Sequence, residues 1–209
     1  MATIALLDYG MGNLRSAEKA FEHVGAEVTR SPDPAVIDAA DGVVLPGVGA
    51  FAEAMRRIGV LGLAEPIRRA VAGGKPLLGI CLGMQLLFDR SDELGEAEGL
   101  GLLGGDVGQL EAPGLKVPHI GWTPTERAAG SPLLQGIADG EPFYFVHSYR
   151  AVPADPADVA ATSEYGERFA AIVARPPVFG AQFHPEKSSR AGLRLLANFN
   201  AICAAVPAA

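Results

Sequence analysis

The chain has 209 residues, of which 49% are hydrophobic and 20% charged, with a formal net charge of −7. This composition excludes wholesale disorder. The acidic balance argues against binding to nucleic acid or to an anionic membrane, because both need clustered positive charge. The length predicts a single domain over residues 1–209 that buries its own core. The two cysteines predict no disulfide framework and fit a reducing compartment.

The sequence shows no targeting or membrane-spanning segment. Residues 1–8 contain no basic side chain, and their apolar run is too short for a signal peptide. Nowhere does the chain approach the roughly 18 uninterrupted apolar residues of a membrane span. We therefore expect a soluble cytoplasmic protein that ends in a short Ala/Pro tail over residues 204–209.

Short apolar strands alternate with amphipathic helices in the first half of the chain. This alternation predicts parallel strands with helices on both faces of the sheet. Asn13 is the expected N-cap of the first helix. The expected strands are Ile4–Leu7, Ala26–Thr29, Val43–Leu45 and Pro76–Ile80, and the expected helices are 14–24, Phe51–Ile58 and Leu63–Ala72.

The second half contains strand-like segments joined by Gly, Pro and Asp, followed by a final helix over Arg190–Ala205. These segments predict hairpins or an extension of the main sheet. The fold class is therefore α/β, an open and mostly parallel sheet flanked by helices with an antiparallel extension. The expected strands lie near 102–110, 115–122, 142–149, 168–175 and 178–183.

The most informative segment, Gly79-Ile80-Cys81-Leu82-Gly83, follows an apolar strand and opens a short helix expected over Leu82–Phe88. This is the setting of a nucleophile elbow with Cys in place of Ser, whose sharp turn needs small residues two before and two after the nucleophile. Gly79 and Gly83 meet that requirement. A helix N-terminus also favours the reactive thiolate. A buried structural cysteine gives the same local pattern.

A second segment, Gln182-Phe183-His184-Pro185-Glu186, places a carboxylate two residues after an imidazole. In an extended backbone both side chains project to the same side, and Pro185 prevents a helix through this point. Such a carboxylate fixes the tautomer of the imidazole and stabilises its charged form. His-x-Glu alone is also typical of a surface ion pair. The combination favours chemistry, because Cys81 and His184 would meet along one edge of a parallel sheet.

Weaker signals surround these two segments. Gly47 and Gly49 directly follow the third strand, where a backbone N–H could stabilise an oxyanion, although a plain strand-to-helix turn looks the same. Gln85 shares a helix face with Cys81. The segment His147-Ser148-Tyr149 ends another strand, and both it and Gln85 could contact a small substrate.

The remaining histidines are interpreted as structural or surface residues, and the second cysteine as structural. His23 and His119 have no obvious partner, and Cys203 lies among Ala and Ile of the last helix as inert core. The sequence contains no metal-ligand spacing, no phosphate-binding loop and no dinucleotide fingerprint. We therefore expect neither a metal nor a cofactor.

Together these motifs resemble the class I, triad-type glutamine amidotransferases over nearly the whole chain. The family motifs are Gly-Ile-Cys-Leu-Gly-Met-Gln at 79–85 and Gln-Phe-His-Pro-Glu at 182–186. Within the family, the chain is similar to the branch of glutaminase subunits that serve imidazole glycerol phosphate synthesis. One departure from that branch is Thr123, where Asn is expected. The motifs of the branch lie at 8–14, 46–51, 118–122, 144–149 and 184–188.

The resemblance implies roles for residues at matching positions. Cys81 would be the nucleophile, His184 the general base and acid, and Glu186 the residue that orients it. The implied binding surface for L-glutamine consists of Gly47, Gly49, Leu82, Gln85, His147, Ser148 and Tyr149. The implied contacts with a partner subunit are Tyr9, Gly10, Met11, Asn13, Trp122, Tyr144 and Lys187.

The resemblance further implies that ammonia from glutamine passes to a separate (β/α)₈-barrel cyclase in a heterodimer. That subunit would make imidazole glycerol phosphate and an aminoimidazole carboxamide ribonucleotide in histidine biosynthesis. It also implies weak glutaminase activity until the partner is bound and is itself occupied by its ligand.

Three alternatives stay open. One is a glutaminase subunit serving anthranilate, aminodeoxychorismate or pyridoxal phosphate synthesis, against which the motifs at 8–13 and 46–49 argue. Another is a cysteine peptidase or acyl hydrolase. The last is a binding module with a relict triad, against which the three intact side chains argue.

Overall fold

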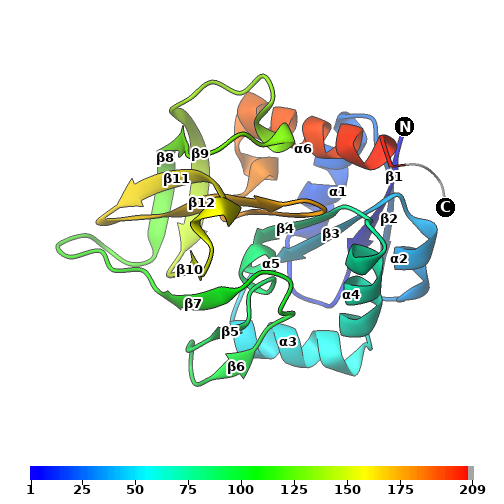
Figure 1. Cartoon of the computed structure of the whole chain (residues 1–209), viewed down its shortest axis with the longest axis horizontal. Coiled ribbons are helices and arrows are strands. Elements are labelled where there is room, and N and C mark those ends of the chain that lie inside the picture. The colour runs from blue at the N-terminus through cyan, green and yellow to red at the C-terminus, as the bar shows by residue number, and fades with distance from the viewer. Residues whose placement is uncertain (207–209) are drawn as a thin grey trace.

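The computed structural model describes residues 1–206, so the last three residues of the predicted tail lie outside the described residues. A nine-stranded sheet runs through the molecule in the order β2-β1-β3-β4-β13-β12-β11-β8-β9 (Figure 1). Its first five strands pair in parallel, as expected from the alternation of strands and helices. They are β1 (Thr3–Leu7), β2 (Glu27–Ser31), β3 (Gly42–Gly47), β4 (Leu77–Cys81) and β13 (Val178–Ala181).

The other four strands form the predicted antiparallel extension. The α/β fold class with an antiparallel extension is therefore confirmed. The extension places the end of β9 and the start of β8 near the carboxyl end of β4, where a site is expected. Its strands are β8 (His119–Arg127), β9 (Glu141–His147), β11 (Val159–Tyr165) and β12 (Glu167–Arg175).

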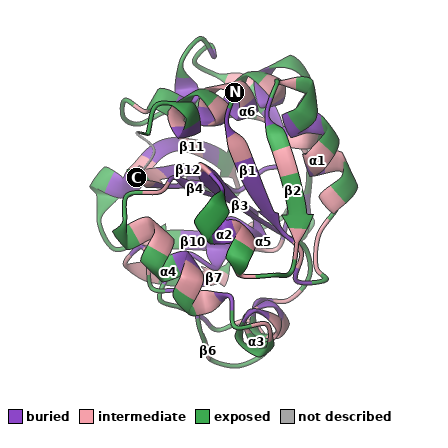
Figure 2. Cartoon of the chain, turned by 90° about the vertical axis from the view of Figure 1, so that its right-hand side faces the viewer, coloured by how far each residue is buried: buried purple, intermediate pink, exposed green. Residues whose placement is uncertain are grey.

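Helices cover both faces of the parallel strands, of which β1, β3, β4 and β13 are buried, whereas the edge strand β2 is largely exposed (Figure 2). Phe21 of α1 and Phe199 of α6 pack in the core on one face, whereas Phe51 of α3 and Ile67 of α4 pack in the core on the other. None of the helices within residues 1–206 is long and apolar enough to cross a membrane. The helices are α1 (Leu14–His23), α2 (Ala35–Ala39), α3 (Phe51–Val60), α4 (Ala64–Ala72), α5 (Leu82–Gln85) and α6 (Ser189–Ala204).

A second, four-stranded sheet in the order β10-β7-β5-β6 was not predicted. The segment 142–149, expected as one strand, ends at His147 in the main sheet, and the chain enters the small sheet at Tyr149. Ser148 is the single residue between the two sheets. The small sheet consists of β5 (Arg90–Ser91), β6 (Ala97–Glu98), β7 (Gly105–Gln109) and β10 (Tyr149–Pro153), and single 3-10 turns occur at Pro132–Leu134, Pro156–Asp158 and Pro185–Lys187.

Several local predictions were wrong. The helix after Cys81 ends at Gln85 and not at Phe88, and the strand expected over 115–122 begins only at His119. Asn13 precedes α1 but its side chain makes no capping hydrogen bond. The missed strand β11 is rich in Ala and is stabilised by pairing with a strand on each side, which its local sequence does not indicate.

Candidate active site

Cys81 stands at the turn between β4 and α5 with φ 55° and ψ −115°, in the left-handed region that non-glycine residues rarely adopt. The neighbouring glycines are required sterically. A Cβ atom on Gly79 would lie 2.5 Å from the Gly83 carbonyl oxygen, and one on Gly83 would overlap the carbonyl oxygen of Leu45. The predicted elbow is therefore present, and it holds the thiol at the carboxyl end of a central parallel strand.

His184 and Glu186 are joined by a close contact. His184 Nδ1 lies 2.8 Å from Glu186 Oε1, and the two side chains are only 5% and 4% exposed. The contact was predicted from an extended backbone, and that conformation was wrong. Residues 185–187 form a 3-10 turn that begins at Pro185, and this turn brings the two side chains together. A buried pair of this kind orients the ring and leaves its Nε2 atom available to another group.

That other group is the thiol of Cys81, which lines the same pocket as His184. Burial of the His184 ring alone would lower its pKa. Hydrogen bonding to Cys81 and Glu186, together with their charges, instead raises the pKa to about 9. His184 therefore carries a proton at neutral pH. The structure brings together the three side chains that the sequence predicted would converge.

The segment Gly47–Gly49 runs beside the elbow, since Gly47 is the register partner of Cys81 in the β3–β4 ladder. Gly49 has φ 105°, a conformation suited to glycine. Tyr9, predicted to contact a partner, is instead buried, and its hydroxyl donates a hydrogen bond to the Pro46 carbonyl at 2.6 Å. The Tyr9 side chain therefore supports the Gly47–Gly49 segment from the protein interior and is not accessible to a partner.

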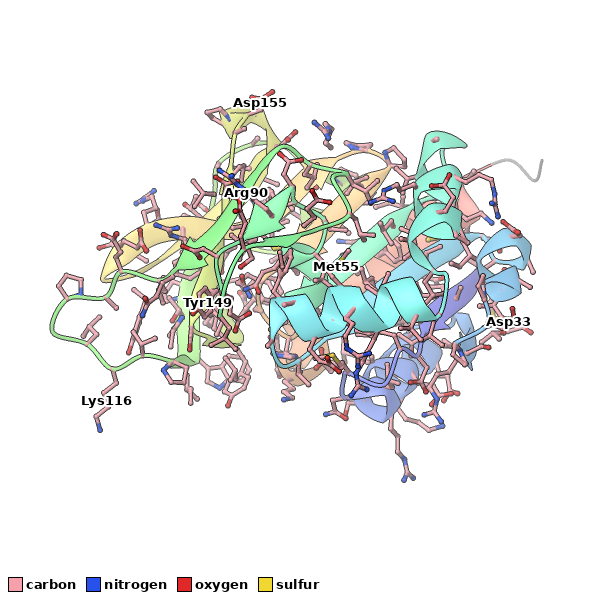
Figure 3. The ribbon with its side chains drawn as sticks, turned by 90° about the horizontal axis from the view of Figure 1, so that it is seen from below. Asp33, Met55, Arg90, Lys116, Tyr149 and Asp155 are labelled. Carbon is pink, nitrogen blue, oxygen red and sulfur yellow. The ribbon has the colours of Figure 1, made fainter. Side chains whose placement is uncertain are left out.

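A pocket of about 280 Å³ opens next to Cys81 and His184. This volume lies just below the usual range for small-ligand sites, roughly 300–1,000 Å³, and suits a ligand the size of an amino acid. Tyr149 lies between helix α3, which carries Met55, and the projecting loop that carries Lys116 (Figure 3). The pocket is lined by Val48, Gly49, Cys81, Leu82, Gln85, Glu93, Pro118, Val146, His147, Ser148, Tyr149, His184 and Lys187.

Two polar residues that line or adjoin the pocket were missed from the sequence. Glu93 borders the pocket and accepts a hydrogen bond from the backbone N–H of Phe51 at 2.8 Å. The buried Gln182 directs its Nε2 atom toward the Cys81 sulfur at 3.9 Å and accepts from Gln85 Nε2 at 3.0 Å. Glu93 lies in a polar turn with no distinctive spacing, whereas Gln182 stands two residues before His184 in a segment already singled out.

One of the two histidines that had no obvious partner in the sequence does have one in the structure. His119 is buried, and its Nδ1 lies 3.0 Å from His147 Nε2. Burial lowers the pKa of both rings to about 4, so both are neutral at pH 7. By contrast, Cys203 is buried in the core as predicted, where burial raises the pKa of its thiol to about 12.

The residues predicted to face a partner lie on the surface, apart from Tyr9. Trp122 is 52% exposed and packs edge-on against the half-buried Tyr144, with ring centroids 5.9 Å apart. Gly10, Asn13 and Lys187 are exposed, and Met11 is half-buried. The backbone of Tyr144 is hydrogen-bonded to His184 and to Ser188, on either side of Lys187, which borders the pocket. The Trp122–Tyr144 pair and the pocket mouth therefore lie on neighbouring parts of the molecule.

Residues 5–202 match the family model described as glutamine amidotransferase class-I. The chain belongs to the class-I glutamine amidotransferase family. Amidotransferases named imidazole glycerol phosphate synthase subunit HisH are strongly similar over nearly their whole length. The protein from Methylococcus capsulatus is 54% identical, with 95% of this chain and 96% of the relative covered. The protein from Moorella thermoacetica is 52% identical, with 95% and 94% covered.

Solved structures share the amidotransferase fold. One described as a glutamine amidotransferase superposes with a TM-score of 0.76 at 20% identity, covering 96% of this chain and 98% of the other. A chain in the structure of PurLQS from Thermotoga maritima gives a TM-score of 0.72 at 22% identity, covering 94% and 96%. At these identities the likeness concerns the class-I fold alone.

Proposed function

We infer that the chain is the glutaminase subunit of an imidazole glycerol phosphate synthase and hydrolyses L-glutamine to glutamate and ammonia for histidine biosynthesis. Identity of about 50% over nearly the full length of such subunits supports this function. The observation that carries the chemistry is the convergence of three side chains: Cys81 and His184 line one pocket, and Glu186 contacts His184 from behind it. We further propose that residues 1–209 form one catalytic domain.

In the first half-reaction, the Cys81 thiolate attacks the side-chain amide carbon of glutamine. Backbone N–H groups of Gly49 and Leu82 receive the oxyanion, and both residues line the pocket. His184, which holds a proton at neutral pH, donates that proton to the departing nitrogen. Ammonia leaves, and the glutamyl group remains on the sulfur as a thioester.

In the second half-reaction, water cleaves the thioester. His184 is now neutral and accepts a proton from the attacking water, while Glu186 stabilises the charged ring that results. The sulfur departs, glutamate is released, and Cys81 and His184 return to their starting states. The net reaction consumes one glutamine and one water and yields one glutamate and one ammonia.

Residues around the nucleophile form the proposed surface for substrate recognition. We propose that Gln85, the segment His147–Tyr149 and the Gly47–Gly49 segment bind the substrate. The carboxylate of Glu93 borders the pocket and would pair with the α-ammonium group of glutamine. Lys187 borders the pocket mouth, where it would attract the α-carboxylate.

Free ammonia at neutral pH is largely protonated and escapes to bulk water, so we propose direct transfer to a cyclase subunit. We propose that this subunit is a (β/α)₈ barrel that forms a heterodimer with the chain. The barrel would make imidazole glycerol phosphate and an aminoimidazole carboxamide ribonucleotide. Exposed Trp122 with Tyr144 and Lys187, and the Gly10–Asn13 loop, are the proposed contact surface. Two free, buried cysteines support a cytoplasmic location.

Glutamate release tests the function directly. The purified chain should release glutamate slowly alone, and about 100-fold faster with a barrel cyclase and its nucleotide ligand, equivalent to about 3 kcal/mol of coupling. Full activity of the isolated chain, unaffected by the cyclase, would contradict the coupling. A glutamine-analogue electrophile should label Cys81 without any turnover of peptides, and turnover of peptides would favour a peptidase.

A further inference from the structure

A continuous line of hydrogen bonds runs from strand β8 into the pocket. Thr123 Oγ1 lies 2.8 Å from His119 Nε2, and His119 Nδ1 lies 3.0 Å from His147 Nε2. His147 Nδ1 lies 2.9 Å from the carbonyl oxygen of Tyr149, which lines the pocket. His119 and His147 are direct partners in the β8–β9 register and are 1% and 6% exposed. The line is therefore buried along most of its length.

Which atom donates and which accepts in each of these hydrogen bonds follows from the Tyr149 carbonyl at the pocket end of the line. A carbonyl oxygen can only accept, so His147 must carry its proton on Nδ1. Because burial keeps that ring neutral, its Nε2 is an acceptor, and His119 must donate from Nδ1. His119 is neutral as well, so its Nε2 accepts a hydrogen bond from the Thr123 hydroxyl. One hydroxyl thus completes a chain in which each ring has a single allowed tautomer.

Packing prevents the first ring from turning away from this arrangement. His119 is stacked between two aromatic rings, Tyr165 at 4.0 Å and Phe145 at 5.1 Å between centroids, with interplanar angles of 18° and 21°. A ring held on both faces keeps its two nitrogens directed at His147 and Thr123. The orientation of the His119 ring is therefore fixed relative to both of its hydrogen-bond partners, His147 and Thr123.

The line of hydrogen bonds continues into the residues that border the pocket. The carbonyl oxygen of Tyr149 also accepts from Gln85 Nε2 at 2.9 Å, and the same amide group donates to Gln182 Oε1 at 3.0 Å. Both N–H bonds of the Gln85 amide are thereby used within the protein. Its carbonyl oxygen is left as an acceptor at the pocket, where a ligand with N–H groups can donate to it.

We propose that His119 and Thr123 are positioning residues for glutamine binding, an inference that rests on the proposed function. They hold the His147 ring in one orientation, His147 holds the Tyr149 carbonyl, and that carbonyl orients the Gln85 amide. Neither His119 nor Thr123 lines the pocket, so both act through other residues. The neighbouring Trp122 is exposed on the same strand, which ties this line to the proposed partner surface.

Three substitutions on strand β8 test the proposal, assayed with the cyclase subunit present. Thr123→Val keeps the shape of the side chain but removes the hydroxyl, and Thr123→Ser restores it. Thr125→Val is the matched control, because Thr125 is a buried threonine of the same strand whose hydroxyl bonds Ser163 instead of the line. We expect Thr123→Val to raise KM for glutamine roughly three- to tenfold with kcat within about twofold, as for the loss of one hydrogen bond.

The remaining variants and the ring nitrogens give independent readouts. Thr123→Ser and Thr125→Val should retain the wild-type KM. In ¹⁵N spectra of the imidazole rings, wild-type His119 and His147 should both show the Nδ1–H tautomer, and Thr123→Val should change the ¹⁵N shift of His119 Nε2, which loses its hydrogen-bond donor. A wild-type KM and a wild-type His119 Nε2 shift in Thr123→Val, or an equal rise of KM in Thr125→Val, would overturn the proposal. If the wild-type chain hydrolyses no glutamine, the proposed function itself fails.

Discussion

His184 Nδ1 and Glu186 Oε1 are 2.8 Å apart, although a 3-10 turn and not an extended strand separates the two residues. Pro185 begins that turn and fixes the spacing. Because the carboxylate occupies Nδ1, the ring presents Nε2 to the Cys81 thiol. The geometry thus assigns a different task to each nitrogen of one ring, and several predictions about the reaction depend on it.

Replacement of the nucleophile should separate chemistry from folding. Cys81→Ala removes the sulfur that forms the thioester, so glutamate release should fall by at least about 1,000-fold, while circular dichroism and the unfolding midpoint remain close to wild type. Cys203→Ala is the matched control, since Cys203 is buried away from the pocket, and it should keep its activity. Retention of most hydrolysis by Cys81→Ala would remove Cys81 from this role.

The two other members of the triad should differ in their effect. His184→Ala removes the group that transfers protons, and we expect a loss of about 1,000-fold or more in kcat. Glu186→Gln removes only the charge that orients and stabilises the ring, and the loss should be smaller, on the order of 100-fold. Steady-state kinetics of both variants provide the comparison. The reverse order of rates would argue against an orienting role for Glu186.

The raised pKa of His184 predicts an alkaline limit to activity. The ring titrates at about 9 in the folded protein and at about 6.5 when unfolded. Its contribution to stability is therefore complete below pH 6.5 and is lost as the pH rises through about 9. Glutaminase activity should decline over the same alkaline range, because the leaving nitrogen loses its proton donor.

Glu186→Gln should move that alkaline limit to lower pH, since the carboxylate contributes to the raised pKa of His184. An NMR titration of the imidazole in both proteins measures the pKa directly, alongside the pH dependence of kcat/KM. An identical titration in the variant would show that Glu186 does not hold the proton on this ring.

The elbow should tolerate no side chain at Gly83. A Cβ atom there would overlap the carbonyl oxygen of Leu45 in the adjacent strand, so Gly83→Ala should lower the free energy of unfolding by about 2–4 kcal/mol. Gly59→Ala is the matched control, because its Cβ would meet open space in helix α3 and should stabilise by about 0.5–1 kcal/mol. Urea unfolding of the two variants measures both changes, and equal stabilities would contradict the steric argument.

Tyr9 should influence catalysis without touching the substrate. Tyr9→Phe leaves the Pro46 carbonyl without its donor and should lower the free energy of unfolding by about 1–3 kcal/mol. We also expect kcat to fall several-fold with little change in KM, because Gly47–Gly49 loses an anchor. Thr125→Val, which also removes a buried hydroxyl, should destabilise the protein but leave kcat unchanged. Unchanged kcat in Tyr9→Phe would limit Tyr9 to a structural role.

The parallel half of the fold and the triad could be predicted because both follow from local pattern. Fully apolar segments such as Leu77–Ile80 predict buried parallel strands, and the spacing of Gly79, Cys81 and Gly83 predicts a sharp turn. The same reasoning found the contact between His184 and Glu186, although it assumed the wrong backbone conformation.

The features that the sequence did not predict depend on contacts between distant segments of the chain. The partnership of His119 with His147 arises from the β8–β9 register over a separation of 28 residues. The small sheet contains two-residue strands whose hydrogen bonds no local pattern indicates. Tyr9 stands in a glycine-rich loop that is typical of a surface, and only the fold reveals that its ring is buried.

The left-handed backbone conformation of Cys81 lowers the stability of the fold at the residue that the activity requires. A non-glycine residue held in such a conformation costs on the order of 1–3 kcal/mol, whereas glycine adopts positive φ with no steric penalty. Glycine at position 81 would relieve that strain and give a more stable protein without catalytic activity. The enzyme accepts a less stable native state in order to present its sulfur.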